Sequence, residues 1–121
     1  MELIEMGTKR GALTLKPELV GKDILVTLTG GRKHIGAMAI GTYDDTTGRA
    51  SSSVITVPGH RDDMIAQKGA QRISAVTGTT SAVSVGIHFD NITDKEIQEI
   101  LAVTAKMIDV LIHSLEARSW K

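Results

Sequence analysis

Three short segments of the sequence pair glycine with histidine or with a cationic side chain. They are Gly30–His34, Pro58–Arg61 and Gly86–Asn91, and each follows a stretch with the composition of a β-strand. Glycine lets the main chain come close to a bound molecule, while Arg, Lys and His supply hydrogen-bond donors and positive charge. This combination favours a phosphate group over an apolar substrate. The predicted anion-binding residues are Gly30, Gly31, Arg32, Lys33, His34, Gly59, His60, Arg61 and His88.

These residues can form one site only if the strands before them end at the same edge of a sheet. Stretches rich in β-branched residues predict five strands, at 12–15, 23–29, 34–41, 52–57 and 81–88. Asp62 and Asp63 predict the start of a helix that runs to about Val76 and stops before Gly78. A second helix begins with a capping box, in which Thr93 is the cap and Glu96 reaches back, and continues with an apolar stripe.

The element order predicts an α+β fold: a two-layer αβ sandwich with a mostly antiparallel sheet and both C-terminal-half helices on one face. We expect a β-meander followed by α-β-α, in which strands 23–29 and 34–41 pair as a hairpin. Strands 23–29 and 52–57 then run in the same direction. Strand 81–88 follows through a helix, which favours a parallel crossover. All three glycine and histidine segments would therefore lie at one edge, beside the start of the first helix.

Composition limits the classes of function. The 14 Lys and Arg balance 14 Asp and Glu, so the chain lacks the basic excess of a nucleic-acid binder. It has no cysteine, which excludes disulfides and thiolate chemistry. The acidic N-terminus and the lack of a long apolar run argue against a signal peptide and a membrane span. We expect a single domain over residues 1–121, located in the cytoplasm.

Other interpretations of these residues stay open. The Gly30-Gly31 pair is also typical of a hairpin turn, and Arg32 and Lys33 of solvated loop charges. Converging His34, His60 and His88 would resemble a zinc site, but their spacing matches no ligand motif, so we predict no metal. No nucleophile motif is present, and we predict no catalytic residue and no enzyme.

Several blocks of the sequence, in their order and spacing, resemble the small prenylated-flavin chaperone family typified by the LpdD protein of gallate decarboxylase systems. The resemblance spans nearly the whole chain and rests on four blocks: Thr29-Gly30-Gly31, His34-Ile35-Gly36-Ala37, Val57-Pro58-Gly59-His60-Arg61-Asp62-Asp63 and Gly86-Ile87-His88-Phe89-Asp90-Asn91-Ile92-Thr93. It implies a fold like that of proteasome assembly chaperones. It also implies a carrier that binds prenylated FMN, or FMN, between a flavin prenyltransferase and a UbiD-type decarboxylase.

A flavin commonly stacks on an aromatic ring, and this sequence offers only Tyr43, Phe89 and Trp120. Phe89 is nearest to the predicted site and completes the expected set of cofactor-binding residues. Two rival functions remain: an assembly or protein-interaction chaperone of the same fold without cofactor, and a small enzyme that uses His60 and His88.

The strand pattern also predicts self-association. Leu25, Met38 and Ile40 alternate onto a sheet face that two helices cannot fully cover, so we expect a homodimer.

Overall fold

The computed structural model describes residues 1–58 and 62–118, which form six strands and two helices. In chain order these are β1 (Ile4–Gly7), β2 (Ala12–Val20), β3 (Asp23–Gly31), β4 (Ala37–Asp44), β5 (Arg49–Thr56), α1 (Asp63–Thr77), β6 (Ser81–His88) and α2 (Asp94–Glu116). Strand β1 was not expected from the sequence. The strands predicted at 34–41 and 52–57 are wrong in their facing ends, because β4 continues to Asp44, β5 already begins at Arg49, and only a short turn around Gly48 separates them.

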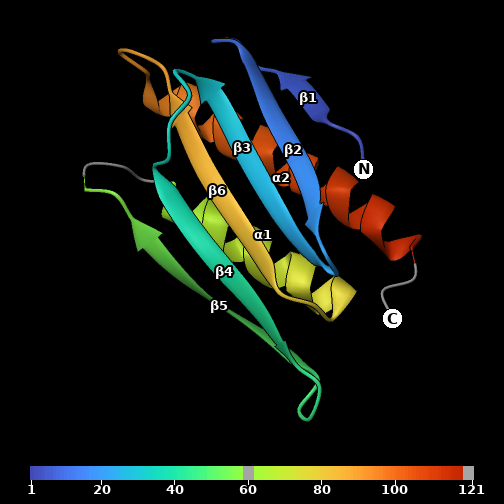
Figure 1. Cartoon of the computed structure of the whole chain (residues 1–121). Helices are drawn as coiled ribbons and strands as arrows, with labels where there is room; N and C mark the ends of the chain where they lie inside the picture. The colour runs from blue at the N-terminus through green and yellow to red at the C-terminus, as the bar shows by residue number, and fades with distance from the viewer. Residues whose placement is uncertain (59–61, 119–121) are drawn as a thin grey trace.

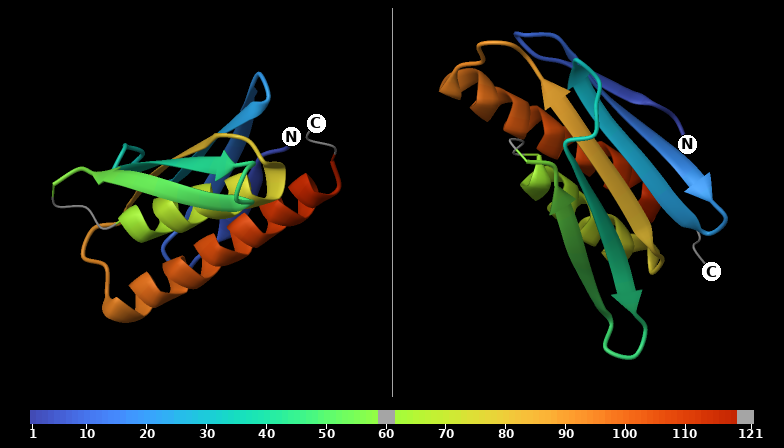
Figure 2. Two further views of the ribbon diagram at one scale, coloured as in Figure 1. Left: turned by 90° about the horizontal axis from the view of Figure 1, so that it is seen from below. Right: turned by 60° about the vertical axis from the view of Figure 1, so that its left-hand side comes forward.

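The strands form one sheet, and both helices lie on the same face of it (Figures 1 and 2). The predicted α+β, two-layer architecture is therefore confirmed. Burial alternates along the strands: Ile24, Val26 and Leu28 are buried, whereas the residues between them are partly exposed. Since α1 and α2 contribute their apolar stripes to the same buried cluster, the core lies between the sheet and the helix layer.

The strand order differs from the expected meander. It is β1-β2-β3-β6-β4-β5, with β6 between β3 and β4, so the predicted hairpin of 23–29 with 34–41 is wrong. Residues 32–36 do not make a tight turn but cross over the end of β6. There the Arg32 amide donates to the His88 carbonyl (3.1 Å) and the Gly36 amide to the Val85 carbonyl (2.9 Å). The strand at 34–41 consequently begins only at Ala37.

Strand direction nevertheless agrees with the prediction. β3 pairs with β6 in parallel, and β6 pairs with β4 antiparallel, as does β5 with β4. The carboxyl ends of β1, β3, β5 and β6 therefore share one edge of the sheet, and α1 and α2 both begin there. We call this the candidate edge.

The two helices end and begin largely as their local signals predict. α1 closes at Gly78, which adopts the left-handed conformation (φ 67°), and α2 begins with the complete Thr93/Glu96 capping box. Among the described residues, no helix combines the length and the apolar character needed to cross a membrane.

Candidate functional site

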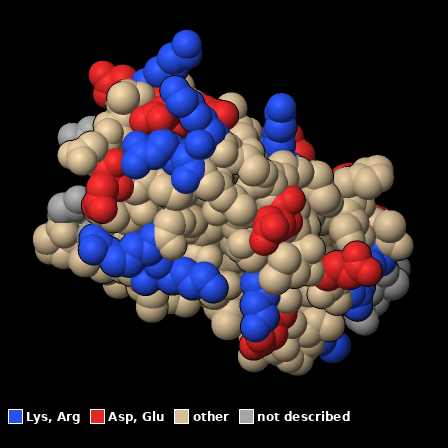
Figure 3. Space-filling view, turned by 90° about the horizontal axis from the view of Figure 1, so that it is seen from above, with Lys and Arg blue, Asp and Glu red and all other residues tan. Residues whose placement is uncertain are grey.

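The candidate edge brings together the described part of the predicted site. The end of β3 supplies Gly30 and Gly31, the following loop supplies Arg32, Lys33 and His34, and the end of β6 supplies His88 and Phe89. Gly59, His60 and Arg61 lie outside the described residues. Figure 3 looks onto this edge and shows Lys and Arg side chains interspersed with Asp and Glu, so its positive charge is local.

The glycines of the site make room for the protein's own backbone. Gly31 has a positive φ of 66°, and a Cβ there would overlap the carbonyl group of His88. A Cβ on Gly86 would overlap the carbonyl group of His34, and one on Gly36 would overlap the carboxylate of Asp62. These glycines therefore allow residues 32–36 to lie directly over the end of β6, and they do not form an open cradle for a ligand.

His34 is held from two sides. Its Nδ1 lies 2.8 Å from the Arg32 carbonyl oxygen, and its Nε2 lies 4.0 Å from Oδ2 of Asp62, the residue before α1. Its ring meets the ring of His88 edge to face, with centroids 6.3 Å apart and planes at 83°. The two imidazoles therefore form one cluster, with a carboxylate beside the first.

His88 has a carboxylate neighbour of its own. Its Nε2 lies 3.0 Å from Oδ1 of Asp90, which is largely exposed. Each histidine of the pair thus has a carboxylate within 4.0 Å of its Nε2. Among residues 1–58 and 62–118, no group of three His, Cys, Asp or Glu side chains is placed to hold a metal ion.

The ring of Phe89 is already in contact with protein groups. It packs against the backbone at Gly11 and Gly31, where added Cβ atoms would lie 3.2 and 3.0 Å from ring carbons. The Arg10 guanidinium carbon lies 5.8 Å from the ring centroid. Tyr43 packs near Gly48 and Gly78 at the opposite edge of the sheet, and Trp120 lies outside the described residues.

Arg10 is a residue of this edge that the sequence did not point to. Its Nη1 donates to Oε1 of Glu96 (3.2 Å), and its Nη2 donates to the Asp90 carbonyl (2.5 Å). The Thr93 amide also donates to Glu96, and this bond together with Arg10 lowers the pKa of the Glu96 carboxyl, although desolvation opposes the shift. Arg10 thereby joins the β1–β2 turn to the connection between β6 and α2. The sequence signal for Arg10 was limited to its partner: the capping residue Glu96 carries a carboxylate that can also bind a distant cation.

The charges at this edge limit where an anion could lie. Arg32 and Lys33 are exposed at the end of β3 and are available to an anion. The buried Asp62 carboxylate lies on the α1 side and would repel a phosphate placed directly at that helix start. An anion bound at this edge would therefore meet less repulsion beside Arg32 and Lys33 than at the start of α1.

Comparison with known proteins agrees with the resemblance noted from the sequence. Residues 7–116 match the model of a prenylated flavin chaperone LpdD-like domain. Protein LpdD of Lactiplantibacillus plantarum is 31% identical over 108 residues, which cover 83% of this chain and 74% of that protein. The match extends through every described strand after β1 and through both helices. This chain belongs to the LpdD-like prenylated flavin chaperone family.

Proposed function

We propose that this protein binds prenylated FMN at the candidate edge and passes it from a flavin prenyltransferase to a UbiD-type decarboxylase. Membership of a family described as prenylated flavin chaperones supports the ligand class. The cofactor supplies the decarboxylation chemistry on the partner enzyme. This chain's own part is to bind, orient and release the cofactor in the cytoplasm, without catalysis.

The observation that carries the proposal is the placement of two exposed cations beside two histidines at one edge. Arg32 and Lys33 follow β3 directly, and His34 and His88 meet behind them. Arg32 suits a phosphate because its planar guanidinium can donate two parallel hydrogen bonds. The proposed site also includes Gly59, His60 and Arg61 as predicted from the sequence; these residues lie outside the described part of the chain.

The flavin ring needs a flat, uncharged surface near this phosphate site. One face of Phe89 lies beside Arg10, so Phe89 offers at most a partial stacking surface. The sheet face away from the helices carries Met38, Ile40 and Ile55 with 37, 45 and 80% of their surface exposed. We propose that a second copy of the chain covers this face. The homodimer would then supply a second wall for the ring.

Calorimetric titration with FMN tests the phosphate site. Arg32→Ala should weaken binding about tenfold or more, because it removes a charge-assisted hydrogen bond. Arg49→Ala is the matched control, since Arg49 begins β5 at the opposite edge and is also exposed. Equal affinities of the Arg32 and Arg49 variants would remove Arg32 from the site. Arg61→Ala, at the end of Gly59-His60-Arg61, should behave like Arg32→Ala.

The rival function is a protein-interaction chaperone that carries no cofactor. The exposed apolar side chains of the open sheet face favour it, because such a surface would also suit a partner subunit. The absorption spectrum of protein purified alongside a flavin prenyltransferase separates the two functions. A co-purifying flavin chromophore supports the carrier, whereas a colourless protein supports the interaction chaperone.

A small enzyme is the third function to test. His88→Asn and His60→Asn should weaken flavin binding and slow activation of a partner decarboxylase only in proportion to that weakening. Turnover by the purified protein that disappears in either variant, with affinity unchanged, would contradict the carrier.

A further inference from the structure

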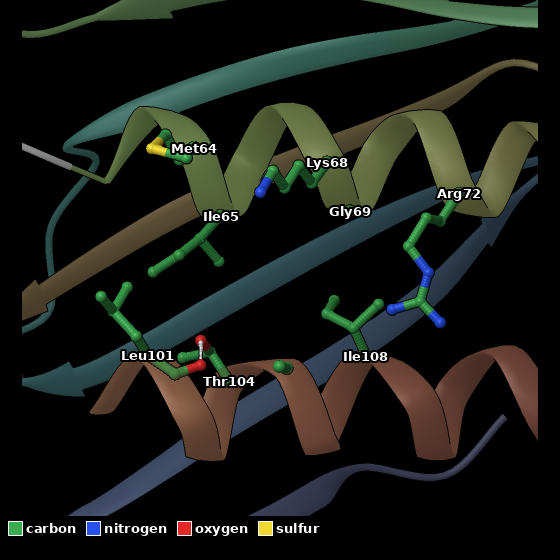
Figure 4. Close-up of a pocket in the computed structure, with 9 residues that line it drawn as sticks. Met64, Ile65, Lys68, Gly69, Arg72, Leu101, Thr104 and Ile108 are labelled. Carbon is green, nitrogen blue, oxygen red and sulfur yellow. Dashed lines mark hydrogen bonds between the residues drawn. The ribbon is translucent and has the colours of Figure 1, made fainter. Parts of the chain in front are cut away.

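A groove separates α1 from α2 on the side of the helix layer away from the sheet (Figure 4). It has a volume of about 290 Å³, and no strand residue lines it. Its walls are Met64, Ile65, Lys68, Gly69 and Arg72 from α1 and Leu101, Thr104, Ala105 and Ile108 from α2. None of the predicted flavin-binding residues that the structure describes lines the groove.

Small residues are part of both walls of this groove, Gly69 on α1 and Ala105 on α2. Cδ1 of Ile108 lies 3.4 Å from a Cβ built on Gly69, so the Ile108 side chain spans the gap at that point. Ile65 and Ile108 point into the gap from opposite sides (Figure 4). Met64 and Leu101, at one end, keep 59 and 40% of their surface exposed. The groove is therefore apolar inside and at one end, and a bound molecule could bury this apolar surface.

Charge at the groove is one-sided. No Asp or Glu is among its lining residues, while α1 contributes Lys68 and Arg72. Arg72 is compensated by Asp109, with Nη2 2.8 Å from Oδ1. Lys68 lies along the α1 side of the gap (Figure 4) and makes no ion pair within 4.0 Å with a carboxylate of the described residues. An apolar groove with one uncompensated cation is complementary to an apolar molecule that carries one anionic group.

We propose that the α1–α2 groove is a second binding site, separate from the flavin site, for a small apolar molecule with a single anionic group. The apolar body would occupy the space between Ile65 and Ile108, and the anion would pair with Lys68. The volume is at the small end of ligand pockets and suits a compact molecule of two or three aromatic rings.

A pair of fluorescent probes tests the charge and the groove together. 1-Anilinonaphthalene-8-sulfonate carries one sulfonate, and N-phenyl-1-naphthylamine is the same ring system without it. The wild type should bind the sulfonate probe more tightly. Lys68→Met should weaken that probe about tenfold, by loss of a charge-assisted hydrogen bond, and leave the neutral probe unchanged. Ala105→Trp should weaken both probes, because the indole fills the groove.

Two controls locate the probe. Lys106→Met removes an exposed lysine of α2 that does not line the groove, and it should leave both affinities unchanged. When the sulfonate probe is added to the wild type, the amide NMR shifts that change should cluster on α1 and α2. The same pattern is expected with and without saturating FMN. Shifts confined to β4 and β5, an unchanged affinity in Lys68→Met, or competitive displacement by FMN would each overturn the second site. If Arg32→Ala loses FMN binding but keeps probe binding, the result concerns the flavin site and leaves the groove proposal standing.

Discussion

The two helices begin at the same edge of the sheet but in different ways. At the start of α2, Thr93 accepts a hydrogen bond from the Glu96 amide (3.2 Å), and Glu96 accepts one from the Thr93 amide (3.0 Å). At the start of α1, Asp62 occupies the cap position, but its side chain makes no capping hydrogen bond. Its carboxylate instead lies beside His34 and fills the space at Gly36.

This difference separates local from long-range stabilisation. The start of α2 is stabilised by two residues three positions apart, with Arg10 added from a distant turn. At the start of α1, Asp62 makes no capping hydrogen bond. Its carboxylate instead helps to hold the loop 32–36 over the end of β6. The loop that carries Arg32, Lys33 and His34 therefore lies beside the helix start that lacks a side-chain capping hydrogen bond.

The largest effect should come from a substitution that breaks the α1 side. In Gly86→Ala the new Cβ would overlap the His34 carbonyl, so the loop 32–36 must move away from β6. We expect a loss of about 3 kcal/mol in the free energy of unfolding, as for overpacked core positions. Urea denaturation measures it.

Gly7→Ala is the matched control for this prediction. Gly7 also lies in a strand, but nothing is within 4 Å of a Cβ built there. Its change should stay within about 0.5 kcal/mol. Equal stability of the two variants would show that the loop yields without cost and that the contact at Gly86 does not constrain the site.

The α2 side should lose less when its long-range partner is removed. Arg10→Ala deletes the bonds to Glu96 and Asp90 and the contact with Phe89, and it should cost about 1–2 kcal/mol. Arg72→Ala provides the comparison, because its pair with Asp109 is 45 and 63% exposed and should be worth less than about 1 kcal/mol. The reverse order of the two losses would contradict a structural role for Arg10.

The same contrast explains which features could be predicted from the sequence. The α2 cap was predicted because Thr93 and Glu96 are close in the chain and their chemistry is specific. The shared edge was predicted correctly because the direction of each strand depends only on whether the chain reverses or crosses over before it. The direction does not depend on which strands become neighbours in the sheet. The pairing of β3 with β4 was wrong because the insertion of β6 is a long-range event, and residues 32–36 resemble an ordinary hairpin loop.

Two further features could not be derived from local patterns. The glycines of the candidate edge suggested close approach of a ligand, but Gly31 and Gly86 allow close approach of the chain's own carbonyls. Sequence composition does not distinguish these roles. Arg10 pairs with Glu96 across 86 positions, and no periodicity or motif connects them.

A third experiment substitutes the cap residue of each helix in turn. Thr93→Ala removes the side-chain acceptor at the start of α2 and should cost about 1 kcal/mol. Asp62→Asn should cost less than Thr93→Ala, because it removes no capping hydrogen bond and the amide has nearly the shape of the carboxylate that packs at Gly36. The same variant removes a negative charge from the candidate edge, so its affinity for FMN should rise. Chemical denaturation and calorimetry measure the two quantities, and a larger loss of stability in Asp62→Asn would reverse the comparison.

The smallest effect concerns acid stability at the α2 start. The bond from the Thr93 amide and the neighbouring Arg10 hold the pKa of the Glu96 carboxyl below its ordinary value of 4.5. Because the pKa is lower in the folded state, ionised Glu96 stabilises the fold above pH 4.5, and this contribution is lost as the pH falls through the folded-state pKa.

The variant Glu96→Gln tests this, because its side chain can still reach back to the cap but has no charge to lose. The free energy of unfolding of the wild type should therefore fall more steeply than that of Glu96→Gln as the pH is lowered from about 5 to about 3. Parallel curves for the two proteins would mean that the charge of Glu96, and with it the pairing to Arg10, contributes nothing to the better-capped helix start.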